Sequence, residues 1–163
     1  FWSTQAREKA RHYEHKEIGY NYRMSNIVAG IGRGQLKVLD ERIAQKRHIF
    51  AYYQEYLGDL EGISFMPMHE NERPNCWLSV IELSDDCPVK PLDVMVALEQ
   101  GDIESRPVWK PMHLQPVFAG CDYIDNGEVG KYLFEHGVCL PSDTKMTDAD
   151  LERICDIIRG LWK

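Results

Sequence analysis

The chain has 163 residues, of which 44% are hydrophobic and 28% charged, and its formal net charge is -7. That length suits one domain with its own hydrophobic core, or a domain with an appended segment. The negative charge argues against a general nucleic-acid-binding protein, which needs a basic face. No apolar run approaches the roughly 20 residues that cross a bilayer, so we expect no nucleic-acid partner and no membrane partner.

Residues 1–23 form a charged N-terminal segment, and a long helix is predicted after it, over residues 25–57. Its apolar positions recur at steps of three, four and seven, which makes one hydrophobic stripe. These positions are Leu36, Leu39, Ile43, Phe50, Tyr53 and Leu57. A helix of about 30 residues is roughly 45 Å long, which is long for a small domain and suits a connector between two domains.

Shorter elements are predicted to alternate along the rest of the chain, residues 58–163. In order they are a strand at 76–83, a helix at 92–100, a strand at 103–107, a proline-rich loop, a helix from Asp125 or Asn126 to His136, a strand at 138–140 and a helix from Thr147. This order indicates a small α+β domain, with helices packed on one face of a sheet of three or four strands.

Two features of the sequence argue against other chemistries. The five cysteines are odd in number, widely spaced and without a CxxC pair, which predicts reduced thiols in a cytoplasmic protein and neither a disulfide framework nor a zinc site. The glycines of Gly30–Gly34 lack the GxGxxG spacing of a dinucleotide site and lie inside a helical pattern. We expect them to allow close packing of this helix against a neighbour.

Three stretches resemble the DegT/DnrJ/EryC1/StrS family of pyridoxal-phosphate-dependent aminotransferases, which act on nucleotide-linked keto sugars. The first is Gly19–Asn26 (GYNYRMSN) with the long helix behind it, the second is the arginine–proline–histidine region of residues 103–116, and the third is Leu140–Pro141–Ser142. The resemblance implies the C-terminal small domain of a fold-type I aminotransferase, residues 24–163, entered by residues 1–23 from a larger N-terminal domain. The Schiff-base lysine of the family would then lie outside this chain.

The resemblance also implies site residues for the cofactor, pyridoxal 5'-phosphate. The family's matching asparagine hydrogen-bonds the cofactor phosphate of the other subunit, and Asn21 occupies that position. Without the resemblance, Asn21 would be interpreted as an ordinary turn residue. Arg23 is a second phosphate or carboxylate ligand, with an interface salt bridge as the equal alternative.

For the substrate, the resemblance points to the loop after the predicted strand at 103–107. Arg106 would bind the diphosphate, His113 a phosphate or sugar oxygen, and Trp109 a base or sugar ring. The alternatives are a salt-bridged arginine, a surface histidine and a core tryptophan, and for Trp109 core packing is favoured.

These expectations define a function for the complete enzyme, an amino transfer from glutamate to a keto sugar. The sequence of Trp109–His113 most closely resembles that of family members that aminate UDP-4-keto-6-deoxy-N-acetylglucosamine. A site shared between subunits implies a homodimer. The chain alone is expected to be inactive. The alternative is a non-catalytic dimerisation or ligand-sensing module with the same fold.

Overall fold

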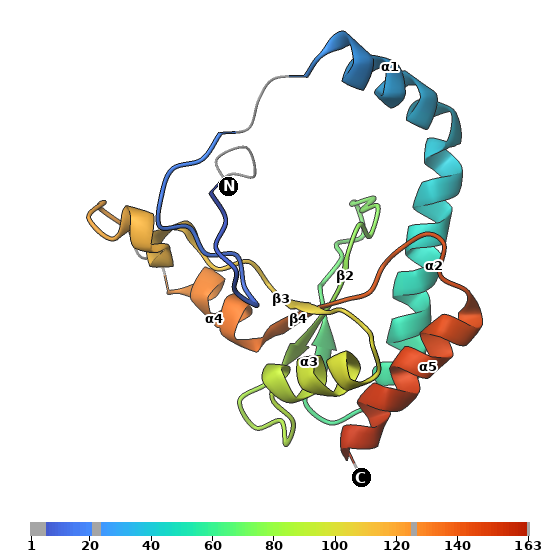
Figure 1. Cartoon of the computed structure of the whole chain (residues 1–163). Coiled ribbons are helices and arrows are strands. Elements are labelled where there is room, and N and C mark those ends of the chain that lie inside the picture. The colour runs from blue at the N-terminus through green and yellow to red at the C-terminus, as the bar shows by residue number, and fades with distance from the viewer. Residues whose placement is uncertain (1–5, 21–23, 125–126, 163) are drawn as a thin grey trace.

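The computed structural model describes residues 6–20, 24–124 and 127–162 (Figure 1). It is an α+β structure in which helices surround one small sheet. The helices are α1 (Asn26–Gln35), α2 (Leu39–Leu57), α3 (Pro91–Gln100), α4 (Val129–His136) and α5 (Asp148–Arg159). The strands are β1 (Ile63–Phe65), β2 (Ser79–Leu83), β3 (Arg106–Pro107) and β4 (Gly137–Leu140), and short 3-10 turns lie at Leu36–Val38, Met112–Leu114, Pro116–Phe118 and Gly160–Trp162.

The four strands form an antiparallel sheet in the order β1-β2-β4-β3. Along β2, buried Ser79, Ile81 and Leu83 alternate with half-buried residues, so one face of the strand points into the core. Ile81 pairs with Val138 of β4, which carries the same apolar face into the next strand. The predicted α+β class is confirmed. Strand β1 was not predicted, because a strand of three residues is too short to give a recognisable sequence pattern.

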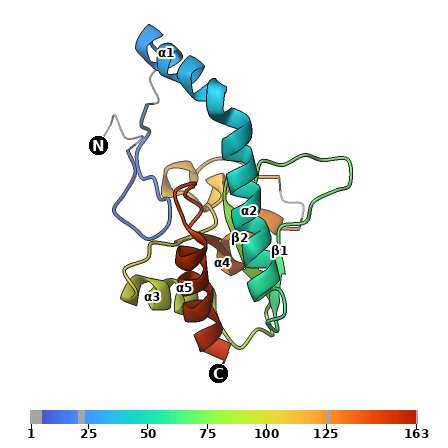
Figure 2. The ribbon, with the colours of Figure 1, turned by 90° about the vertical axis from the view of Figure 1, so that its right-hand side faces the viewer.

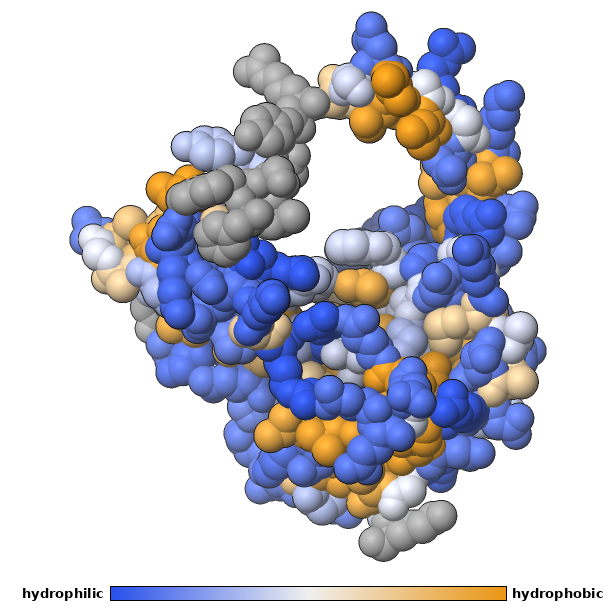
Figure 3. All heavy atoms as spheres, in the orientation of Figure 1, coloured by the Kyte–Doolittle hydropathy of each residue, from blue (hydrophilic) through white to orange (hydrophobic). Residues whose placement is uncertain are grey.

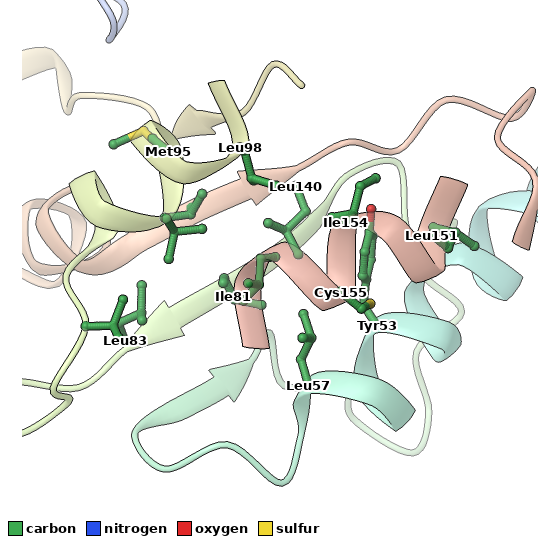
Figure 4. Close-up of a cluster of buried hydrophobic side chains, with 14 of the residues drawn as sticks. Tyr53, Leu57, Ile81, Leu83, Met95, Leu98, Leu140, Leu151, Ile154 and Cys155 are labelled. Carbon is green, nitrogen blue, oxygen red and sulfur yellow. The ribbon is translucent and has the colours of Figure 1, made fainter. Parts of the chain in front are cut away.

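Helices α2, α3 and α5 cover the buried face of the sheet (Figures 2 and 4). Tyr53 and Leu57 of α2 meet Leu151 and Ile154 of α5 in this core. Tyr53 is fully buried, and its hydroxyl donates to the backbone carbonyl of Pro141 over 2.9 Å, so the one polar atom of this side chain is satisfied. This hydrogen bond ties the segment after β4 to α2.

Helix α4 contacts β2, β3 and β4 from the side of Glu82. Burial, together with the Glu82 and Asp85 carboxylates, raises the pKa of Tyr132 in this helix. Glu82 alternates with the core residue Ile81 along β2, which places α4 opposite the three core helices. Gly137 is required where α4 meets β4, because a Cβ atom there would lie 2.4 Å from Cγ2 of Val108.

The predicted long helix over residues 25–57 is interrupted. It consists of α1, a 3-10 turn at Leu36–Val38 and α2, and Val38 leaves helical geometry with φ -118° and ψ 12°. The turn redirects the chain, so α1 stands away from the body of the molecule (Figures 1 and 2). Ser25 caps α1 by accepting a hydrogen bond from the Val28 amide, yet no residue of α1 is buried.

Other element boundaries differ from the predictions by a few residues. The strand predicted at 76–83 begins at Ser79, and Cys76, at the predicted start, has a left-handed backbone with φ 52°. The caps predicted for α4, Asp125 and Asn126, lie outside the described residues. Thr147 caps α5 as predicted, in a reciprocal pair with Asp150.

Candidate functional site

The two predicted cofactor ligands, Asn21 and Arg23, lie outside the described residues. Their assignment to the cofactor phosphate therefore stays a prediction. The neighbouring side chains of Tyr20 and Met24 are 60% and 73% exposed.

Two of the three predicted substrate residues line one pocket of about 290 Å³ beside the sheet. Arg106 starts β3 and pairs with Cys139 of β4, while Trp109 follows β3 by two residues. The wall is completed by the end of β4, the segment after it and two further aromatic residues, Tyr13 and Trp77. His113 lies on the loop beyond and is not part of this wall.

Trp109 is stacked with two other rings. Its ring centroid is 5.9 Å from that of Tyr13, with 16° between the planes, and 5.9 Å from that of Trp77, with 27° between the planes. Trp109 is 42% exposed, so it is not the fully buried core tryptophan of the favoured alternative. The three rings come from the N-terminal segment, the stretch before β2 and the stretch after β3, and sequence spacing gave no signal of their meeting.

Arg106 is held by a neighbouring carboxylate. Its Nε donates to Oε1 of Glu104 over 2.7 Å, Nη2 contacts the same oxygen, and Nη1 donates to the Arg11 carbonyl over 3.3 Å. The Arg106 side chain is 41% exposed. The alternative of a salt-bridged arginine is thus present in this structure, and binding of a diphosphate by Arg106 requires displacement of Glu104.

His113 lies in the 3-10 turn Met112–Leu114 and stacks on Tyr123 with 3.7 Å between ring centroids. Its Nε2 atom is buried and has no hydrogen-bond partner among the described residues. A buried imidazole nitrogen without a partner costs free energy, which identifies this atom as one that a ligand or another part of the protein would satisfy.

Gln115, which the sequence did not single out, fixes this loop. The side chain is 2% exposed; its oxygen accepts from the His15 amide over 2.9 Å, and its Nε2 donates to the carbonyls of Tyr13 and Lys110. Lys110 adds an ion pair of 3.0 Å with Glu14, and this pairing lowers the pKa of the Glu14 carboxyl. The N-terminal segment is therefore anchored to the loop that carries Trp109 and His113.

Lys46 of α2 supports the other side of the pocket. Its Nζ donates to the backbone carbonyls of Trp77, over 3.0 Å, and of Ser142. Burial lowers the pKa of Lys46, against a smaller opposing effect of Asp143. The ammonium group thus joins α2 to the two segments that enter β2 and leave β4.

Comparison with known proteins identifies the family. The model of the DegT/DnrJ/EryC1/StrS aminotransferase family matches residues 3–159. This chain belongs to the DegT/DnrJ/EryC1/StrS aminotransferase family. The resemblance found in the Asn–Tyr–Arg stretch, the histidine loop and the Leu–Pro–Ser segment is thereby confirmed at the level of the family.

Relatives match this chain over nearly all of its length. A protein of Bacillus subtilis named as a pyridoxal phosphate-dependent aminotransferase, EpsN, is 44% identical over 165 residues, covering 99% of this chain and 42% of its own length. A GDP-perosamine synthase of Vibrio cholerae is 32% identical and covers 93% of this chain and 41% of its own length. The chain thus spans about two-fifths of the length of these relatives.

A solved structure shows the same fold. The aminotransferase TlmJ from Streptoalloteichus hindustanus superimposes with a TM-score of 0.73 at 17% identity, over 99% of this chain and 43% of that chain. The predicted α+β fold with a small sheet covered by helices is confirmed, whereas the long helix is interrupted at Leu36–Val38 and its role as a connector between two domains stays a prediction.

The described residues do not make up a complete pyridoxal phosphate site. Three cations near the pocket already have partners. Lys46 donates hydrogen bonds to two backbone carbonyls, Lys110 forms an ion pair with Glu14, and Arg106 forms one with Glu104. Among the described residues, Nε2 of His113 is the one side-chain nitrogen that is buried without a hydrogen-bond partner. The described part of the chain also contains no helix long and apolar enough to cross a membrane.

Proposed function

We propose that this chain is the small-domain part of a pyridoxal-phosphate-dependent aminotransferase that acts on a nucleotide-linked keto sugar. The observation that carries the proposal is the 44% identity with EpsN over 99% of the chain, within a family match over residues 3–159. The GDP-perosamine synthase among the relatives supports a nucleotide-sugar substrate. We further propose glutamate as amino donor, UDP-4-keto-6-deoxy-N-acetylglucosamine as acceptor, and a homodimer.

In this proposal the cofactor, when bound, carries the amino group between donor and acceptor. We place the lysine that binds it covalently in a part of the enzyme outside this chain, and this rests on the family resemblance; in this chain Lys46 donates to backbone carbonyls and Lys110 is paired with Glu14. In this proposal the side-chain amide of Asn21 donates to the cofactor phosphate of the other subunit, and the guanidinium of Arg23 is a second phosphate or carboxylate ligand, with an interface salt bridge as its equal alternative.

The substrate-side residues of this chain hold and orient the nucleotide sugar. The guanidinium of Arg106 exchanges its hydrogen bonds with Glu104 for hydrogen bonds with the diphosphate, because the diphosphate carries more negative charge than one carboxylate. His113 donates from its buried Nε2 to a phosphate or sugar oxygen and so satisfies the orphaned atom. Trp109 forms part of the pocket wall.

The test uses the complete enzyme with pyridoxal phosphate, glutamate and UDP-4-keto-6-deoxy-N-acetylglucosamine, and mass spectrometry of the amino sugar. We expect product with wild type. We expect a loss of about 10- to 150-fold in kcat/KM for His113→Ala, as for removal of a hydrogen bond of about 1.5–3 kcal/mol to a charged group. The matched control is His69→Ala, since His69 is exposed in the loop between β1 and β2.

Three results would contradict parts of this proposal. Bound cofactor without product would reject the UDP-linked acceptor, and the GDP-linked keto sugar would then be assayed. Neither cofactor nor product would favour the non-catalytic module. Equal losses in the His113 and His69 variants would remove His113 from the site.

A further inference from the structure

Tyr13, Trp109 and Trp77 form a row of stacked rings, in which Tyr13 is covered on its outer side and Trp77 is exposed. The guanidinium of Arg7 lies 4.9 Å from the Tyr13 ring centroid, so a cation covers Tyr13. Tyr13 stacks with Trp109, Trp109 stacks with Trp77, and Trp77 is 61% exposed. The exposed side of Trp77 lies beside the pocket that Trp109 and Arg106 also line, so a flat ligand can reach it.

The backbone of Trp77 is fixed in place without any ligand. Its amide donates to Oδ1 of Asn75 over 3.1 Å, and its carbonyl accepts from Nζ of Lys46 over 3.0 Å. The preceding residue, Cys76, has the uncommon φ of 52°. These contacts fix the main chain at Trp77, so only its side-chain torsions remain to be ordered when a ligand binds.

The pocket behind Trp77 also has an unsatisfied polar group. The hydroxyl of Ser105 is buried and has no hydrogen-bond partner among the described residues, and Ser105 lines the same pocket as Trp77 and Arg106. A ligand that lies against Trp77 and enters the pocket would meet an aromatic face and, once Arg106 leaves Glu104, a guanidinium. A nucleotide carries the two matching parts, a planar base and phosphate.

We propose that Trp77 is the platform on which the nucleobase of the sugar nucleotide stacks, as the next ring of the row Tyr13–Trp109–Trp77. This proposal rests on the proposed function, because it assigns one part of that substrate. Stacking between near-parallel rings suits a flat base, and it tolerates different bases since every base has a π-face. Trp77 is thus a binding residue, while Trp109 and Tyr13 support it from behind.

The test measures nucleotide binding to the complete enzyme without amino donor, by tryptophan fluorescence and calorimetry. The probes are UMP and GMP, which carry a base, and N-acetylglucosamine 1-phosphate, which carries sugar and phosphate but no base. We expect Trp77→Ala to weaken binding of both nucleotides about 5- to 150-fold, the range that corresponds to a stacking contribution of about 1–3 kcal/mol. Trp77→Phe should retain binding within about threefold, and the sugar phosphate should be unaffected by either variant.

Trp162→Phe is the matched control, because Trp162 lies outside the pocket and its Nε1 donates to the carbonyl of Glu61. Unchanged nucleotide affinity in Trp77→Ala would overturn the platform, as would weakened binding of the sugar phosphate alone. Trp77→Leu, which keeps apolar bulk without an aromatic face, should behave as Trp77→Ala. If it binds as tightly as wild type, stacking is not the interaction and the proposal is wrong.

Failure of this inference is distinguishable from failure of the proposed function. An enzyme that forms amino sugar with the same KM in wild type and Trp77→Ala keeps the reaction and rejects the platform. A protein that binds UMP through Trp77 but makes no amino sugar keeps the platform and rejects the reaction. A wild-type protein that binds neither nucleotide rejects the platform.

Discussion

One buried amide, that of Gln115, holds the N-terminal segment to the loop of the candidate site. Its three hydrogen bonds reach His15, Tyr13 and Lys110, and the first two partners are about 100 residues away in sequence. A side chain that is 2% exposed cannot exchange these bonds for water, so their loss is costly. The position of Trp109 against Tyr13 depends on the same anchoring.

We predict that Gln115→Leu destabilises the chain by about 2–4 kcal/mol, because a similar volume remains but three hydrogen bonds are lost. Urea unfolding gives the change in free energy, and limited proteolysis should show faster cleavage within residues 6–20. The control is Gln45→Leu, a half-buried glutamine whose partners, Glu41 and Arg42, are its neighbours on α2. Equal effects of the two changes would contradict the anchoring role.

The sequence predicted some site residues and missed others for a physical reason. Arg106, Trp109 and His113 stand in a local pattern of strand, prolines and histidine, so a family resemblance finds them. Tyr13, Trp77 and Gln115 act through contacts between segments 32 to 102 positions apart, which no local pattern encodes. The pairing of Arg106 with Glu104 also could not be predicted from the sequence. The side chains of residues two positions apart meet only in certain rotamers, and the sequence does not specify those rotamers.

At the scale of elements, the periodic helices were predicted well and the interrupted one was not. The apolar stripe begins at Leu36, inside the break at Leu36–Val38, and runs on to Leu57, so periodicity alone did not reveal the break. Only its C-terminal part, from Ile49, is buried, while Leu36 and Leu39 are 66% and 46% exposed. Side chains drawn in orange on α1 face the open space beside the body of the molecule (Figure 3).

The glycines of α1 lead to a prediction about this helix. A Cβ atom added at Gly32 would meet nothing within 4 Å, and glycine inside a helix costs about 1 kcal/mol relative to alanine. In this chain Gly32→Ala should therefore raise helicity in circular dichroism and slow amide exchange in α1 by about fivefold.

Gly137→Ala is the opposite control, since its Cβ would lie 2.4 Å from Val108 Cγ2 and 2.6 Å from the Leu133 carbonyl oxygen, and it should destabilise the chain. In the complete enzyme we predict close packing of α1 against a neighbour. There Gly32→Ala would destabilise α1 rather than stabilise it, because the added methyl group would clash with that neighbour. A Gly32→Ala variant of this chain that loses helicity would contradict the argument.

For the whole molecule, the issue is whether the chain holds the cofactor by itself. It spans about two-fifths of its relatives, and the described residues offer a pocket wall and no complete cofactor site. The neutral amine is the form of lysine that reacts with pyridoxal phosphate, and burial lowers the pKa of Lys46, which favours that form. Two backbone carbonyls, however, accept hydrogen bonds from its Nζ, and reaction would break both.

We therefore predict that borohydride reduction of this chain with pyridoxal phosphate yields no stoichiometric adduct in the intact mass, whereas the complete enzyme yields a single adduct outside the chain. Lys46→Arg, which keeps a cation against the two carbonyls but removes the amine, should give the same background as wild type. A stoichiometric adduct that disappears in Lys46→Arg would show that Lys46 leaves its carbonyl partners to bind the cofactor. The proposal that the Schiff-base lysine lies outside this chain would then be wrong, since the chain would bind the cofactor covalently by itself.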